Sequence, residues 1–348
     1  MPHETQGVDA HLPGTATTRS QMLRRGIVRL VLGLLAVGVA VPVGGVLGAL
    51  LALIGVVVAY TGLHRVVWAW RRQRVDLLVG FCLGWLILVG LLALLAPVLP
   101  LGEHNDVSAA LTDPSYLPPF RYSDHLLGTN NFGLDMLARS IYGARTSLVI
   151  ALGAVAVGTL VGGTIGVVAG YLRGGVDRAV GVATNALLAV PPLVLLITLS
   201  IVLEPGLRNL SLALAVLTIP SMVRLARANT ITFAQREFVL AARALGATRL
   251  RIIARELVPN VALPVFSMAV VLISVLIVAE SSLSFLGLGI QQPEPTWGNM
   301  ISEGQGGVME REPFIVLIPG FFLFLTVFSF NLLGERAQKR WDPRSAKL

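Results

Sequence analysis

Long runs of apolar residues alternate with short polar segments along most of the chain. A membrane-spanning helix needs about 20 apolar residues, and the period-two alternation typical of membrane β-barrel strands is absent. The pattern therefore predicts an all-α multi-pass membrane protein with about eight transmembrane helices. We expect these helices at residues 26–42, 45–62, 76–99, 146–170, 177–203, 208–226, 262–285 and 314–333. The first pair would also fit a re-entrant or interfacial hairpin.

Composition and loop charge turn this pattern into a topology. The chain has 55% hydrophobic residues, 13% charged residues and a mean hydropathy of +0.77, which excludes an ordinary soluble domain. Loops 101–139 and 286–313 are acidic, whereas the two termini and residues 65–74 are rich in basic residues. Because cytoplasmic loops carry excess Lys and Arg, we expect the acidic loops outside and both termini in the cytoplasm. Residues 1–22 are polar and predict a disordered cytoplasmic tail.

Two sequence features inside the predicted spans indicate how the helices pack and bend. Glycines recur at intervals of four residues, which places them on one stripe of a helix and predicts close approach of a neighbouring helix. These glycines are Gly158, Gly162, Gly166 and Gly170. Pro191 and Pro192 fall inside the helix expected at residues 177–203, which predicts a kink or a break there. Such a break would serve either to line a pathway or only to bend the helix.

The polar segment between two of the apolar runs is the strongest candidate for a functional element. Seven arginines lie between Arg224 and Arg255. We expect one short helix at residues 234–245, stopped by Gly246, and a second at residues 248–257, closed by Pro259. Helical spacing would bring Ala241, Ala242 and Leu245 together as a surface of small side chains ringed by arginine. The segment is therefore predicted to dock another protein.

A few polar residues lie inside the predicted spans. Glu280 stands beside Ser281 and Ser284, and an intramembrane carboxylate is costly unless it faces a cavity or a partner. Glu280, these serines, Asn185 and Pro191 are candidates for a translocation path or for contact with a partner subunit. The alternatives are that Glu280 lies near the membrane interface and that Asn185 bonds a neighbouring helix.

The sequence offers no catalytic or metal-binding pattern. The five histidines are dispersed, Cys82 is the single cysteine, and neither HExxH nor GxSxG occurs. No Gly-Lys pair exists, so the phosphate loop of an ATPase is missing from this sequence. The arginines flank apolar spans, which argues against nucleic-acid binding. We therefore expect a protein that is not itself an enzyme and holds no cofactor.

Four stretches of the sequence, taken in order, resemble a known family. The strongest is EFVxAARxxG at residues 237–246, followed by VPN at residues 258–260. The others are residues 125–148, residues 280–300, which end in PTWGNM, and residues 330–344, which contain FNLLG and DPR. Together they resemble the permease subunits of binding-protein-dependent ABC importers, and most closely the C-type permeases for dipeptides and oligopeptides. The resemblance covers roughly residues 75–348.

This resemblance implies a fold, a set of partners and roles for particular residues. The fold is the transmembrane domain of a type I ABC importer, in a bacterial cytoplasmic membrane. The partners are a second, B-type permease, two cytoplasmic ATPase subunits that carry ATP and Mg, an external solute-binding protein and membrane lipid. Residues 227–260 are implied to couple to the ATPases, and residues 297–299 to face the receptor. The implied residues are Glu237, Ala241, Ala242, Arg243, Gly246, Arg249, Pro259 and Asn260 for coupling, and Trp297, Gly298 and Asn299 for the receptor.

The sequence therefore predicts a permease for small peptides, with a core at residues 75–348 and an additional helical pair at residues 23–74. Related permeases for nickel chelates or glutathione remain alternatives for the substrate. An ion-coupled secondary transporter or channel is a further alternative, but it would predict paired intramembrane acids and inverted repeats. The chain departs from the family at Leu240 and Glu256, where Glu and His are frequent.

Overall fold

The computed structural model describes residues 23–33, 35–36, 55, 58, 61–62, 76–121 and 124–341. The chain forms two units, one up to Phe81 and one from Cys82 onward. In the first unit, residues 23–33 are helical, as expected for part of the first predicted span. The remainder of the predicted helical pair, the tail at residues 1–22 and the loop at residues 65–74 lie almost wholly outside the described residues.

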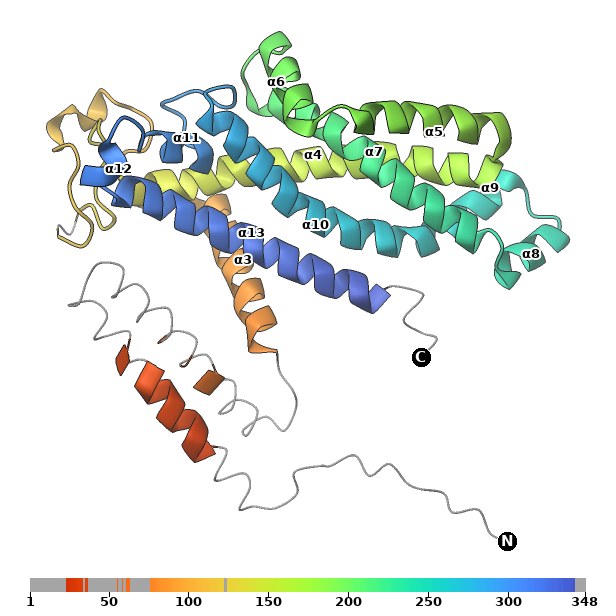
Figure 1. Cartoon of the computed structure of the whole chain (residues 1–348), viewed down its shortest axis with the longest axis horizontal. Helices are drawn as coiled ribbons and strands as arrows, with labels where there is room; N and C mark the ends of the chain where they lie inside the picture. Colours follow the sequence, from red (N-terminus) through yellow and green to blue (C-terminus); the bar gives the residue numbers. More distant parts are fainter. Residues whose placement is uncertain are drawn as a thin grey trace, which may run out of the picture. The chain divides into compact units, whose positions relative to one another are not determined.

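From residue 77 on, the described chain is mainly helical, with its longest irregular connection between α3 and α4 (Figure 1). They are α3 (Leu77–Leu95), η1 (Ala109–Thr112), α4 (Met136–Leu172), α5 (Gly174–Ala189), α6 (Pro192–Val202), α7 (Leu207–Phe233), α8 (Glu237–Ala244), α9 (Arg249–Arg251), η2 (Ile252–Leu257), α10 (Val258–Phe285), α11 (Trp297–Ser302), α12 (Val308–Arg311) and α13 (Phe314–Trp341). Among the described residues, five helices are long and apolar enough to cross a membrane, and the bent pair α5–α6 gives a sixth candidate. This confirms a multi-pass helical protein.

α4, α7, α10 and α13 run beside one another, and short helices lie at the two ends of this bundle (Figure 1). We call residues 98–135 and 286–313, which include α11 and α12, the α11 end. We call residues 234–257, which include α8 and α9, the α8 end. Between the ends, apolar side chains of α4, α7 and α10 form the main core, including Leu148, Met222 and Leu276.

The predicted glycine stripe forms the contact between α4 and α7. A β-carbon added at Gly162, Gly166 or Gly170 would come within 2.8 Å of a carbonyl oxygen of α7. At Gly158 an added β-carbon would overlap the Thr218 hydroxyl. Because only hydrogen fits at these four positions, the two backbones pack in direct contact along several turns. The prediction of a close helix contact is confirmed.

The helix expected at residues 177–203 is broken, as the two prolines predict. α5 and α6 meet at an angle of 89° across Val190 and Pro191. Pro191 has no backbone N–H and fixes its own φ, and Val190 is extended, as residues before proline usually are. α5 and α6 are therefore two separate helices.

Several helices are longer than the sequence predicts. α4 begins at Met136 because the side chain of Asp135 caps it, accepting from the backbone N–H of Ala138 at 2.7 Å. Arg139 therefore belongs to a helix and not to the loop predicted at residues 101–139. α7 extends to Phe233 and α13 to Trp341, so the polar residues that follow each apolar run continue the helix.

The prediction that Pro259 closes the second short helix is wrong. Residues Arg249–Phe285 form one continuous helical rod, and η2 within it is a π-helical turn. A π-turn lets the ladder of hydrogen bonds change register, and Pro259 follows it in the first turn of α10, where a missing N–H is tolerated. The α8 end is therefore joined rigidly to the core of the bundle.

Candidate functional site: a docking surface at the α8 end

α8 is a short helix that ends within one residue of the predicted position but begins three residues later than predicted, because Ala234 still caps α7. It begins at Glu237 and ends at Ala244, and Gly246 follows with a φ of +82°. This left-handed conformation is favourable for glycine and strained for most other residues, so Gly246 reverses the chain after the helix. Thr248 then caps the next helix, where its hydroxyl accepts from the backbone N–H of Arg251. The turn fixes the direction in which α8 points.

A small buried cluster holds α8 against the bundle. Val239, Ile252 and Leu257 are almost fully buried, and Phe233 and Tyr171 pack against them. These residues come from α8, η2, the end of α7 and the end of α4. The cluster therefore joins residues 234–257, the candidate docking element, to the two helices that contact through glycine. The guanidinium of Arg243 also lies 6.0 Å from the ring centroid of Tyr171.

The outer surface of this element combines exposed leucine with exposed arginine. Leu240, Leu245 and Leu250 are 50%, 88% and 75% exposed. Five exposed arginines lie in the α8 end: Arg236, Arg243, Arg249, Arg251 and Arg255. An apolar patch rimmed by charge is typical of a surface that another protein covers.

The residues predicted for coupling divide into two groups. Glu237, Ala241, Arg243, Gly246 and Arg249 are exposed and available to a partner. The remaining three have contacts within the chain or lie apart from α8. Ala242 packs into the buried cluster, which corrects the prediction of one face shared with Ala241 and Leu245. Pro259 and Asn260 are exposed on α10, and the Asn260 amide donates to the Glu256 carbonyl at 2.6 Å.

The α11 end contains a buried ion pair that the sequence analysis did not identify. Arg139 on α4 donates to the carboxylate of Glu303 at 2.6 Å, and the two side chains are 1% and 5% exposed. Arg139 also donates to the carbonyls of His104 and Pro293, and Asn130 donates to Glu303. Burial raises the pKa of the Glu303 carboxyl, and the Arg139 guanidinium opposes that shift. The two partners are 164 residues apart, so no local pattern indicates their contact.

Glu280 lies in the interior of the described chain and not on an open surface. It is 0% exposed, and its carboxylate accepts from the hydroxyls of Ser147 and Ser284 at 2.8 and 2.7 Å. Ser281 donates to it at 3.4 Å. Because Ser147 is on α4, this network joins α4 to α10. A role for Glu280, Ser281 and Ser284 in a path or at a permease interface stays a prediction.

The receptor-facing prediction for residues 297–299 needs correction. Trp297, Gly298 and Asn299 are all buried, and the indole of Trp297 donates to the Ser140 carbonyl at 3.1 Å. Asn299 and Thr296 form a capping box at the start of α11. A β-carbon on Gly298 would overlap the Ser281 carbonyl. These residues attach the α11 end to the bundle, so none presents a side chain to another protein.

The other two path candidates lie on α5 and at the break before α6. Asn185 and Pro191 are exposed, and the side-chain amide oxygen of Asn185 accepts from Arg224 at 3.2 Å, which agrees with bonding to a neighbouring helix.

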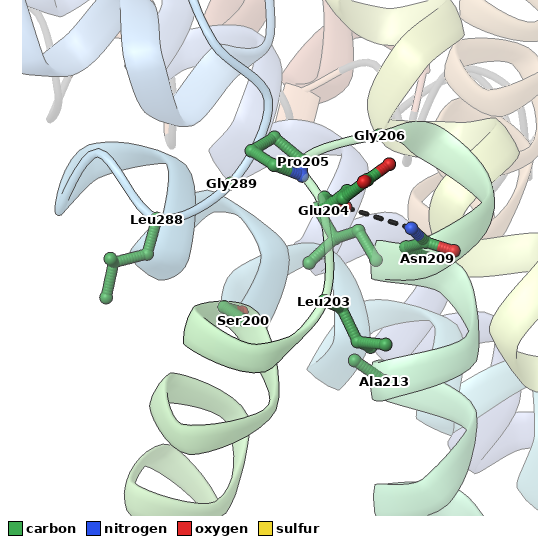
Figure 2. A pocket seen from close by; sticks show the side chains of 10 residues that line it. Ser200, Leu203, Glu204, Pro205, Gly206, Asn209, Ala213, Leu288 and Gly289 are labelled. Carbon is green, nitrogen blue, oxygen red and sulfur yellow. Dashed lines mark hydrogen bonds between the residues drawn. The ribbon is translucent and has the colours of Figure 1, made fainter.

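Figure 2 shows a pocket at the turn between α6 and α7, where Ser200, Glu204 and Asn209 lie near Gly289. Its volume of about 10 Å³ accommodates one water molecule and is too small for a peptide. A cavity of about 190 Å³ adjoins Arg139 and Glu303.

Comparison with known proteins identifies the class to which this helical bundle belongs. Residues 162–347 match the family described as "Binding-protein-dependent transport system inner membrane component". The chain belongs to this family of transport permeases, and it is therefore a multi-pass protein of the inner membrane. The matched region includes the docking element, α10 and α13.

Named relatives extend the similarity over most of the chain. The dipeptide transport system permease protein DppC of Alkalihalophilus pseudofirmus is 35% identical over 73% of this chain and 82% of its own length. DppC of Bacillus subtilis is 35% identical over 79% of this chain and 85% of its own. The glutathione transport system permease protein GsiD of Pectobacterium atrosepticum is 35% identical over 64% and 73%.

Proposed function

We propose that this chain is a permease subunit of an ATP-driven importer that moves dipeptides or oligopeptides across the cytoplasmic membrane. The observation that carries the proposal is the α8 surface, which consists of the exposed Leu240, Leu245 and Leu250 and the exposed arginines around them. This surface belongs to an element that the buried cluster anchors to the bundle. Membership of the transport permease family supports the interpretation of this surface as a contact with another subunit of a transport system. ATP hydrolysis belongs to separate subunits, since the chain has no Gly-Lys pair from which a phosphate loop could form.

The α8 surface has the chemistry expected of a contact with an ATPase subunit. Leu245 and Leu250 are suited to an apolar cleft, because burying one leucine contributes about 1.5–3 kcal/mol. Arg243 and Arg249 would face an acidic rim and orient the two proteins. Two ATPase subunits, one for each permease of a pair, complete the motor in this proposal.

The charge of the loops supports one orientation in the membrane. The α8 end is basic and lies in the cytoplasm, whereas the acidic α11 end lies outside, where an external solute-binding protein delivers its cargo. Both termini are then cytoplasmic. The second permease is a related chain of B-type, and the substrate passes between the two permeases.

Coupling follows from the rigidity of the docking element. ATP binding closes the two ATPase subunits and displaces each docked α8. The buried cluster around Val239 transmits that displacement to α4 and α7, because close-packed side chains move as a unit. The bundle then alternates between inward-open and outward-open arrangements by rigid-body movement.

The names of the relatives support a peptide as the substrate. Two relatives with broad coverage are named dipeptide transport permeases. One relative of similar identity is named for glutathione, itself a tripeptide derivative, so that substrate is the second candidate. Within this proposal the external binding protein selects the solute.

Affinity purification of the tagged chain from native membranes tests the proposal. We expect a second permease and two ATPase subunits to co-purify, identified by mass spectrometry, and ATP to be required for peptide uptake into liposomes containing the complex. A chain that purifies alone and transports solute along an ion gradient without ATP would instead support a secondary transporter.

A further inference from the structure

α5 is joined to the rest of the second unit through a bend at each end. At its start, Arg173 and Gly174 have φ values of +56° and +65°, both in the left-handed region. At its end lies the 89° break before α6. A helix between two sharp bends can change its angle without unfolding, provided that its side contacts permit the movement.

Apolar packing contributes little to holding α5 in place. Of its sixteen residues, only Thr184 is buried within the chain. Val176 and Val182 are 46% and 65% exposed. Because few apolar contacts fix α5, its position within this chain depends on its polar contacts with α7.

Two such contacts link α5 to α7. Arg227 binds both carboxylate oxygens of Asp177, donating from Nε to Oδ1 and from an Nη to Oδ2, the second at 2.7 Å. Arg224, one turn earlier on α7, donates to Asn185 at 3.2 Å. The pair is partly exposed, at 35% for Arg227 and 20% for Asp177, so its energy is modest. Its two parallel hydrogen bonds nevertheless fix orientation as well as distance.

Arg227 lies on the segment that carries the docking element. α7 ends at Phe233, and Phe233 packs against the cluster that anchors α8. Less than two helical turns separate Arg227 from Phe233. Any displacement of α8 that turns the end of α7 therefore moves Arg227, and with it the carboxylate that it binds.

We infer that Asp177 is a positioning residue for transport, whose two-point contact with Arg227 makes α5 follow α7 when the docking element moves. The inference rests on the proposed function, since it assigns α5 a share of the movement driven from α8. Without the contact, α7 would still move on ATP binding, but α5 would follow it incompletely. ATP would then be hydrolysed with less solute moved.

The first test measures solute uptake per ATP hydrolysed in the reconstituted full complex. For Asp177→Asn we expect normal assembly with the ATPases and continued hydrolysis, with uptake per ATP reduced about 5–10-fold, the effect of roughly 1–1.4 kcal/mol of lost coupling. Asp177→Glu, which retains a carboxylate for Arg227, should recover most of the ratio. Arg208→Gln is the control variant. It removes an exposed arginine from the first turn of α7, the helix that also carries Arg227.

The outcomes separate this inference from the proposed function. If the wild-type complex shows no ATP-dependent uptake, both are overturned. If the wild type is coupled and Asp177→Asn has the same uptake per ATP, only the inference is overturned. The inference is also overturned if uptake by Asp177→Asn falls only in proportion to the amount of assembled complex, because a purely structural role of Asp177 would have that effect.

A distance measurement gives a second, independent readout. Spin labels at Val182 on α5 and Thr232 on α7 occupy exposed positions, and Cys82 is the single native cysteine to be replaced. We expect the distance in the wild type to remain unchanged when ATP binds, and to broaden on ATP binding in Asp177→Asn. A wild-type distance that changes with ATP, or an Asp177→Asn distance that does not broaden, would overturn the inference.

Discussion

The two ends of the bundle differ in whether their charged side chains are buried or exposed. At the α11 end, Arg139 and Glu303 are buried and paired, the His104 and Pro293 carbonyls accept from Arg139, and the Asn130 amide donates to Glu303. At the α8 end, Arg243 and Arg249 are exposed, and Leu245 beside them is 88% exposed. The α11 end pairs its buried charges within the chain, although Nε of Arg139 has no hydrogen-bond partner among the described residues, whereas the α8 end leaves apolar surface exposed. The difference separates charged residues that are paired within the fold from exposed residues that are candidates for docking another protein.

This comparison predicts that substitutions at the α11 end reduce stability, whereas those at the α8 end reduce transport. The largest effect on stability is expected for Arg139→Met. It leaves the Glu303 carboxylate buried without its counter-charge, which costs about 3–5 kcal/mol. The measurement is the thermal unfolding midpoint and yield of the purified complex.

The double variant Arg139→Met, Glu303→Met is the control for this prediction. It removes both charges, so it should be more stable than Arg139→Met alone. If Arg139→Met unfolds at the wild-type temperature, the pair does not stabilise the α11 end and the comparison fails.

A smaller effect is expected at Glu280, which is buried and bonds to serine hydroxyls but to no basic side chain among the described residues. Glu280→Ala leaves the hydroxyls of Ser147 and Ser284 without their acceptor and opens a cavity, which together cost about 2–4 kcal/mol. Glu280→Gln retains an acceptor oxygen and nearly the same volume, so its loss should stay below about 1 kcal/mol. Unfolding of both variants in detergent provides the measurement. Equal losses would show that the serine network does not determine the stability at this position.

The smallest effect is expected from pH, through His104 at the α11 end. Its ring stacks on Tyr142 with centroids 3.6 Å apart, and burial lowers the pKa of His104, while Glu103 and Glu294 partly oppose the shift and Arg139 adds to it. The unfolded chain, with a pKa of about 6.5, therefore binds a proton more readily than the folded chain as the pH falls. The free energy of unfolding should decrease from about pH 7.5 to about pH 5.5.

His104→Gln tests whether this histidine causes the pH dependence. The variant cannot titrate in this range, so its unfolding midpoint should fall less between the two pH values than that of the wild type. An identical fall in both proteins would assign the effect to other groups.

The features predicted correctly from the sequence are those that depend on local pattern. The long apolar helices, the glycine stripe from Gly158 to Gly170, the break at Pro191 and the stop at Gly246 all follow from residue type and spacing. Each can be predicted from the types and spacing of residues within one segment, so the segment that it contacts need not be known in advance.

The features that were missed or mistaken depend on contacts between distant segments. Trp297 stands in a polar segment and was expected at a surface, but the lack of side chains at Gly143 and Gly298 lets the segment enter the bundle. The Arg139–Glu303 pair joins residues that are 164 positions apart in the sequence. Pro259 was expected to end a helix, and the preceding π-turn allows the rod to continue.

The most direct test of the central claim is Leu245→Glu in the reconstituted complex, with ATPase association and ATP-driven uptake measured together. Leu111→Glu, at an exposed leucine of the α11 end, is the matched control for ATPase association. We predict that Leu245→Glu weakens ATPase association and reduces uptake about 10-fold or more, equivalent to at least about 1.4 kcal/mol, while the unfolding midpoint of the chain is unchanged. Wild-type association and uptake in Leu245→Glu would contradict the assignment of the α8 surface as the docking site.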